Sequence, residues 1–99
     1  MIEIQWLSES IEEAKKISRT LVDEGLVACA NILPGITSIY VWGKHVEESE
    51  EIMCLFKAPE ENYDEIEAII VDQCSYDMPA ITKKEVEGYE PYVKWVNEG

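Results

Sequence analysis

The feature that most constrains this chain is a long extended stretch with apolar side chains on both of its faces. Alternation predicts a strand from Leu26 to Leu33, an interruption at Pro34-Gly35, and a continuation from Ile36 to Trp42. The continuation carries apolar or aromatic side chains on each face, namely Ile36, Tyr40 and Trp42 on one and Ile39 and Val41 on the other. A strand that is apolar on both faces needs cover on both faces.

The chain is too short to supply all of that cover itself. With 99 residues it buries enough surface for one core but not for two, so we expect one domain spanning residues 1–99. We therefore expect a second copy of the chain to cover the part of the strand that remains exposed.

The other elements alternate between strand and helix. The patterns predict strands at 2–7, 52–57 and 80–86, helices at 11–24 and 60–73, and a short terminal helix with Pro91 in its first turn. Gly43-Lys44 and the acidic run Glu47–Glu51 are expected to form a turn region between two antiparallel strands.

The first helix has recognisable start and stop signals. Ser10 to Glu13 has the form of a capping box, in which the Ser10 hydroxyl accepts from the Glu13 amide and Glu13 reaches back. Gly25 is well placed to end the helix in a left-handed conformation. The order β-α-β-β-α-β plus a terminal helix predicts an α+β, ferredoxin-like fold with an antiparallel sheet.

Charge and cysteine content narrow the possible partners and the compartment. Eight Lys and Arg stand against twenty-one Asp and Glu, a net charge of −13, which disfavours nucleic acid and membrane surfaces as partners. The residues Met1 to Ile4 show no basic region of the kind that opens a signal peptide. Three cysteines are too few for a disulfide framework, so we expect a cytoplasmic protein.

Few side chains are placed for catalysis or tight metal binding. Cys29 and Cys54 fall within strands and are expected in the core, whereas Cys74 ends a helix stripe and is more open to function. His45 stands alone in the expected turn, with no triad partner. We therefore expect a binding module and not an enzyme.

Several segments resemble the CutA divalent-cation-tolerance proteins. They are Leu26-Val27-Ala28-Cys29-Ala30-Asn31-Ile32, Pro34-Gly35, Ser38-Ile39-Tyr40, Trp42, Glu50-Glu51, Tyr76 with Pro79, and Tyr92 with Trp95. The similarity covers nearly the whole chain. It implies a ferredoxin-like subunit, similar to the PII signalling proteins, that assembles into a homotrimer and is implicated in tolerance to divalent metal ions, copper among them.

The resemblance also implies where ligands bind. PII-like assemblies hold ligands in clefts between subunits, and we expect Tyr40, Trp42, Lys57 and Tyr76 to line such a cleft. The family's metal-linked His-Pro-Tyr segment is Cys74-Ser75-Tyr76 here, so Cys74 is the one candidate ligand for copper or another divalent metal ion.

Two other functions are consistent with this fold. One is a purely structural trimer that scaffolds another protein. The other is a small acylphosphatase-like hydrolase, which needs an arginine to clamp phosphate, and the chain offers only Arg19 in the first helix. A stable protein partner would favour the first, and turnover of an acyl phosphate would favour the second.

Overall fold

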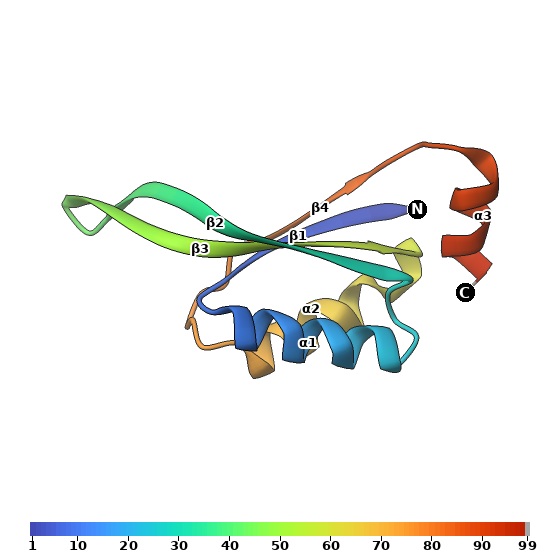
Figure 1. Cartoon of the computed structure of the whole chain (residues 1–99), viewed down its shortest axis with the longest axis horizontal. Coiled ribbons are helices and arrows are strands. Elements are labelled where there is room, and N and C mark those ends of the chain that lie inside the picture. Colours follow the sequence, from blue (N-terminus) through green and yellow to red (C-terminus); the bar gives the residue numbers. More distant parts are fainter. Residues whose placement is uncertain (99) are drawn as a thin grey trace.

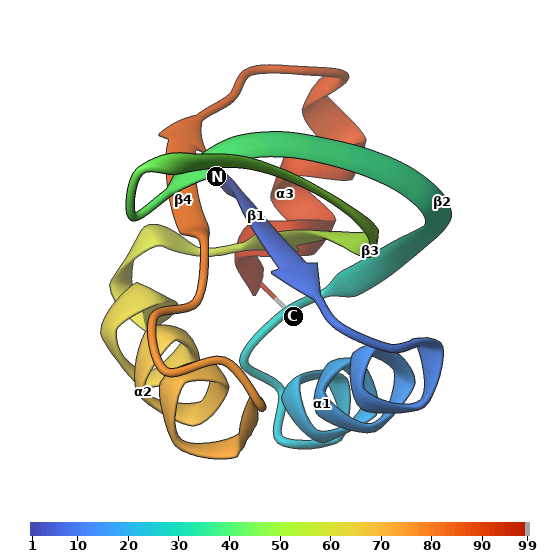
Figure 2. The same cartoon turned by 90° about the vertical axis from the view of Figure 1, so that its left-hand side faces the viewer.

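The computed structural model describes residues 1–98 and has the predicted ferredoxin-like architecture. The strands are β1 (Ile2–Ser8), β2 (Cys29–Trp42), β3 (His45–Ala58) and β4 (Ile81–Glu85). The helices are α1 (Ile11–Asp23), a 3₁₀ turn η1 (Glu60–Asn62), α2 (Tyr63–Gln73) and α3 (Glu90–Glu98). The sheet is antiparallel in the order β2-β3-β1-β4, and α1 and α2 lie side by side against one of its faces (Figures 1 and 2).

The core fills the space between the sheet and these two helices. Its fully buried members are Ile2, Ile4 and Trp6 from β1, Cys54 and Phe56 from β3, Ala14, Ile17 and Leu21 from α1, and Ile66 and Ile70 from α2. The rings of Trp6 and Phe56 stack with centroids 6.5 Å apart. Burial raises the pKa of Cys54 to about 11, as expected for a core thiol.

The start of α1 confirms half of the predicted capping box. The Glu13 amide donates to the Ser10 hydroxyl at 3.2 Å, and Gly25 follows the helix with φ +72°. The Glu13 carboxylate does not reach back to Ser10, however. It accepts instead from the Ser8 hydroxyl at 2.6 Å and from the Glu9 amide at 3.3 Å, which ties the helix to the end of β1.

The hairpin of β2 and β3 differs from the prediction at two places. Pro34-Gly35 does not break the strand but forms a bulge within one 14-residue strand, with Gly35 at φ +78°. The acidic run Glu47–Glu51 is not a turn, because β3 already begins at His45. Exposed strands accept charged side chains readily, so the run extends the ladder, and Tyr40 pairs with Glu47.

The outer half of this hairpin projects beyond the helices as a two-stranded arm (Figure 1). Its apolar side chains are exposed in the single chain, with Ile39, Val41, Trp42 and Val46 each between 62% and 73% accessible. Three of them, Ile39, Val41 and Trp42, are among the residues that the sequence predicted to need cover. The arm therefore presents an extended apolar surface that the fold of one chain leaves open.

The helix α3 lies at the opposite end of the molecule from the tip of the arm (Figure 1). Val96 anchors it by burial, and the rings of Tyr92 and Trp95 lie 5.8 Å apart. The Tyr92 hydroxyl lies 3.3 Å from the thiol of Cys29, which is half-buried at the start of β2 and not in the core as expected. Among residues 1–98, no helix is long and apolar enough to span a membrane.

Candidate functional site

A cavity of about 760 Å³ lies at the base of the hairpin arm. Three parts of the fold form it: the end of β1, the outer half of the hairpin, and the connection between α2 and β4. The lining residues are Leu7, Ser38, Ile39, Tyr40, Trp42, Glu47, Glu51, Ser75, Tyr76, Asp77, Met78 and Ala80. The volume falls within the range of small-molecule sites in proteins.

The cavity brings together three of the four residues predicted to line a ligand cleft. Tyr40 and Trp42 come from β2, and Tyr76 comes from the connection after α2. Lys57 does not line this cavity, because it lies near the other end of β3 and its Nζ atom is 3.1 Å from Glu3 Oε2. The ligand-binding role of these residues stays a prediction.

Glu51 is the most deeply placed charged group of this cavity. Glu51 is only 7% exposed, although it ends an acidic run whose other members are mostly open to solvent. Burial, followed by contact with the Glu51 carboxylate, raises the pKa of Tyr76 to about 12. The phenol of Tyr76 therefore stays protonated at neutral pH and is able to donate to this carboxylate.

Hydrogen bonds hold Tyr76 in place through its neighbour Ser75. The Ser75 amide donates to Glu13 Oε1, and the Ser75 hydroxyl donates to Glu9 Oε2, each at 2.5 Å. Burial opposes ionisation of Glu13, but hydrogen bonds from Ser8, Ser75 and Glu9 hold the pKa of its carboxyl below the usual value. The start of α1 thus fixes the segment that carries Tyr76 into the cavity wall.

Glu51 and Asp77 line the cavity although neither was predicted as a ligand-binding residue. Glu51 was grouped with an expected turn, whereas the structure places it on β3 opposite Ile36. Alternation was the available signal: residues 47, 49 and 51 share one face of β3, and Glu47 pairs with Tyr40.

The residues of one chain do not fit the metal that the resemblance implies. In residues 1–98, no three His, Cys, Asp or Glu side chains lie close enough to hold a metal ion. The Cys74 thiol donates to the Tyr76 carbonyl at 3.4 Å, and burial raises its pKa, which disfavours the thiolate that binds metals. The metal role of Cys74 stays a prediction that needs ligands from outside the single chain.

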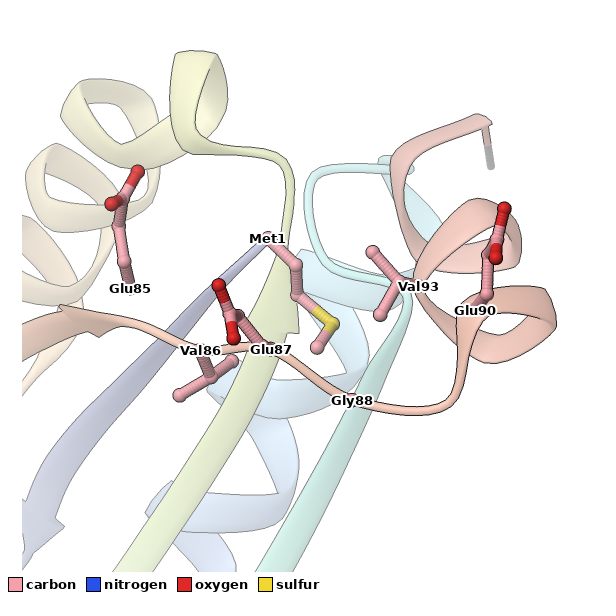
Figure 3. A pocket seen from close by; sticks show the side chains of 7 residues that line it. All are labelled: Met1, Glu85, Val86, Glu87, Gly88, Glu90 and Val93. Atoms are coloured by element: carbon pink, nitrogen blue, oxygen red, sulfur yellow. The ribbon is translucent and has the colours of Figure 1, made fainter.

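A second hollow, of about 920 Å³, lies at the opposite end of the molecule between β4 and α3 (Figure 3). Its charged residues are Glu85, Glu87 and Glu90. Figure 3 shows Glu85 and Glu90 on opposite sides of the hollow, the first on β4 and the second at the start of α3. These side chains do not converge on one position, so the hollow is a weaker candidate than the hairpin cavity.

Arg19, the one residue suited to an acylphosphatase-like site, is exposed on α1. It lines a shallow hollow with Lys15, Ser18 and Asp23, and it does not line the hairpin cavity. A phosphate clamp needs the arginine to face the reacting centre together with other donors. The geometry offers this hydrolase no support.

Comparison with known proteins gives one consistent answer. The family described as "CutA1 divalent ion tolerance protein" matches residues 4–99. The divalent-cation tolerance protein CutA of Thermus thermophilus is 36% identical over 90 residues, which cover 90% of this chain and 87% of that protein. The corresponding protein of Pyrococcus horikoshii is 35% identical over 88 residues, covering 88% of this chain and 85% of that one.

Solved structures agree with the sequence comparison. The Thermus thermophilus divalent cation tolerance protein superimposes with a TM-score of 0.95 at 34% identity, covering 99% of this chain and 97% of that one. CutA from Xylella fastidiosa gives a TM-score of 0.94 at 30% identity, covering 98% and 94%. The family model covers residues 4–99, and the Thermus thermophilus structure aligns with 99% of the chain. The chain therefore belongs to the CutA1 family of divalent ion tolerance proteins.

Proposed function

We propose that this protein is a cytoplasmic homotrimer that acts as a small binding or signalling module in the cell's tolerance of divalent metal ions, copper among them. Its ligands bind in the hairpin cavity, which becomes a cleft between subunits on assembly. The observation that carries the proposal is the coincidence of an uncovered apolar arm with a partly aromatic cavity at its base.

The arm supports assembly because soluble monomeric proteins rarely leave an extended apolar surface uncovered. Ile39 and Val41 share one face of the hairpin with Val46, the direct partner of Val41, and Trp42 lies on the other face. The outer edge of β2 also ends the sheet and leaves backbone groups free to pair with another strand. Cyclic assembly of identical chains would cover both features at once.

The same assembly places the cavity beside a neighbour. Trp42 is 62% exposed and lines both the arm and the cavity, so a subunit that covers the arm also approaches the mouth of the cavity. A ligand in the cavity would then contact the interface and alter it. This arrangement suits a signalling role, because the ligand site and the assembly surface share Trp42.

The proposed role in metal-ion tolerance does not require a complete metal site within one chain. A module of this kind responds to a ligand or to a metal held between subunits, with Cys74 as the candidate ligand from each chain. The cytoplasmic assignment is supported by the thiols of Cys29, Cys54 and Cys74, which are all free.

Two measurements on the intact protein test this function. Light scattering at micromolar concentration is expected to give a trimer, and a particle of 11.3 kDa would refute the assembly. Titration calorimetry with Cu(I), Cu(II), Zn(II) and common nucleotides, together with thermal shifts, tests ligand binding. A trimer with no heat and no shift for any of them would favour the alternative, a purely scaffolding trimer built on the same exposed arm.

A further inference from the structure

Glu51 brings a largely buried carboxylate into the wall of the hairpin cavity. Glu51 is more than nine-tenths buried, and none of the residues that line the cavity is Lys, Arg or His. The ion pairs found within residues 1–98 join Lys57 and Lys84 to Glu3, at a distance from this cavity. A buried carboxylate is strongly unfavourable unless a countercharge reaches it.

The nearest polar neighbour does not provide that countercharge. Tyr76 contacts the Glu51 carboxylate, but it is a neutral phenol. Two further carboxylates, Glu47 and Asp77, line the same cavity and add negative charge. The whole chain carries a net charge of −13, and the resulting negative potential attracts cations to the protein.

The rest of the wall selects for a particular kind of cation. The rings of Tyr40, Trp42 and Tyr76 line the cavity together with Ile39 and Met78. Aromatic faces attract ammonium and guanidinium groups, and they also pack against the carbon atoms that carry these groups. A carboxylate surrounded by aromatic rings is the arrangement by which proteins recognise organic cations.

A bare metal ion fits the same cavity poorly. Calcium requires six to eight oxygen ligands and magnesium six, and zinc sites take three or four protein ligands. No cluster of three or more such side chains forms within residues 1–98, so Glu47, Glu51 and Asp77 are too far apart to share one ion. A cavity of about 760 Å³ is also much larger than an ion requires.

We propose that the hairpin cavity binds a small organic cation with a primary ammonium or guanidinium group, which pairs with Glu51 while its carbon chain lies against Tyr40 and Tyr76. This inference rests on the proposed function in one respect, namely that the cavity is the ligand site. It goes further by assigning the chemical class of the ligand and the residue that recognises it.

The test uses the full-length protein in its native assembly and a set of matched probes. Agmatine and butylammonium carry the proposed groups, and 1-butanol has the same carbon chain without the charge. Titration calorimetry, with the intrinsic tryptophan fluorescence of the protein as a second readout, is expected to show saturable binding of both cations and none of the alcohol. Absence of saturable binding by either cation refutes the proposal.

Two variants with the same net charge locate the binding. Glu51→Gln is expected to weaken agmatine binding at least tenfold, because it removes the charge inside the cavity. Glu48→Gln removes a charge from the same strand at an exposed position outside the lining, and it is expected to leave binding unchanged. Equal affinity in the two variants would place the cation elsewhere and overturn the assignment.

Further outcomes separate this proposal from the broader function. Tyr40→Leu keeps Glu51 and is expected to weaken agmatine several-fold, which tests the aromatic wall if Glu51→Gln folds poorly. A changed oligomer mass in Glu51→Gln, with no amine binding to the parent protein, would show that a neighbouring subunit's cation fills the cavity. Binding of copper or a nucleotide without amine binding would refute the organic cation and leave the proposed function standing.

Discussion

Lys57 Nζ lies 3.1 Å from Glu3 Oε2, across the paired strands β3 and β1. From the other side, Lys84 Nζ on β4 lies 3.5 Å from Glu3 Oε1, so one carboxylate bridges the three strands. The register explains the contact, because Glu3 is the direct partner of both lysines. The hydrogen bond from Lys57, which outweighs the opposing effect of burial, lowers the pKa of Glu3.

This bridge predicts a stability that decreases in acid. A carboxyl whose pKa is lowered in the folded state stabilises the fold at every pH above its pKa in the unfolded chain, which is near 4.5 for Glu3. This stabilisation is lost as the pH falls through the lower pKa that Glu3 has in the folded protein. Glu3→Gln is expected to cost about 1 kcal/mol at neutral pH, since both partners are partly exposed. Urea unfolding at about pH 7 and about pH 3 should show that this difference disappears in acid.

A matched variant tests whether the effect belongs to the bridge. Glu85→Gln removes a carboxylate from an exposed position on β4 with no ion pair within residues 1–98. It is expected to change the free energy of unfolding little at either pH. A loss as large as that of Glu3→Gln would attribute the effect to overall charge and contradict the assignment.

Trp42 is the residue of the arm whose removal should affect assembly most. Its indole is 62% exposed in the single chain, and Trp42→Ala is expected to weaken association by roughly 3–5 kcal/mol per subunit if a neighbour buries it. Sedimentation over a dilution series measures this change, and the unfolding midpoint of the parent should rise with concentration. Val71→Ala, on the exposed face of α2, is the control and is expected to leave association unchanged. If Trp42→Ala also leaves association unchanged, the indole lies outside the interface.

Two glycines provide a matched pair for backbone strain. Gly25 has φ +72°, which a residue with a Cβ atom adopts at a cost, so Gly25→Ala is expected to destabilise the fold by about 1 kcal/mol. Gly88 has no such conformation, and a Cβ there meets Val93 Cγ2 at an ordinary 3.9 Å. Thermal unfolding of Gly88→Ala should be unchanged or slightly raised, and a similar loss in both variants would contradict the strain argument.

Much of the fold follows from local patterns in the sequence. The apolar spacing of Ile17, Leu21, Ile66 and Ile70 gave both helices of the sandwich, and Ser10 and Gly25 marked the ends of the first one. The element order then allowed few topologies. The expected break at Pro34-Gly35 and the expected start of the second hairpin strand at Ile52 were wrong, because an exposed ladder tolerates both the bulge and the acidic run.

The candidate site was predicted only in part, for a physical reason. Aromatic side chains such as Tyr40 and Tyr76 are visible in the sequence because they are uncommon, whereas Glu51 is one of many acidic residues. What distinguishes Glu51 is burial, and that depends on tertiary contacts with the segment around Tyr76. The position of Lys57 depended in the same way on the strand register, which pairs it with Glu3.

The tyrosines predict a second loss of stability, in alkali. Burial and the contact with Glu51 raise the pKa of Tyr76 to about 12, whereas the ordinary value is 10.0. The folded state therefore holds this proton more tightly than the unfolded chain, so the stabilisation is complete below about pH 10 and is lost as the pH rises toward 12. Tyr76→Phe removes this contribution and should reduce the loss of unfolding free energy between about pH 8 and about pH 11. Tyr89→Phe, at an exposed position, is the control and should keep the pH dependence of the parent protein. If Tyr76→Phe also keeps the parent's pH dependence, the contact between Tyr76 and Glu51 does not stabilise the protonated phenol in solution.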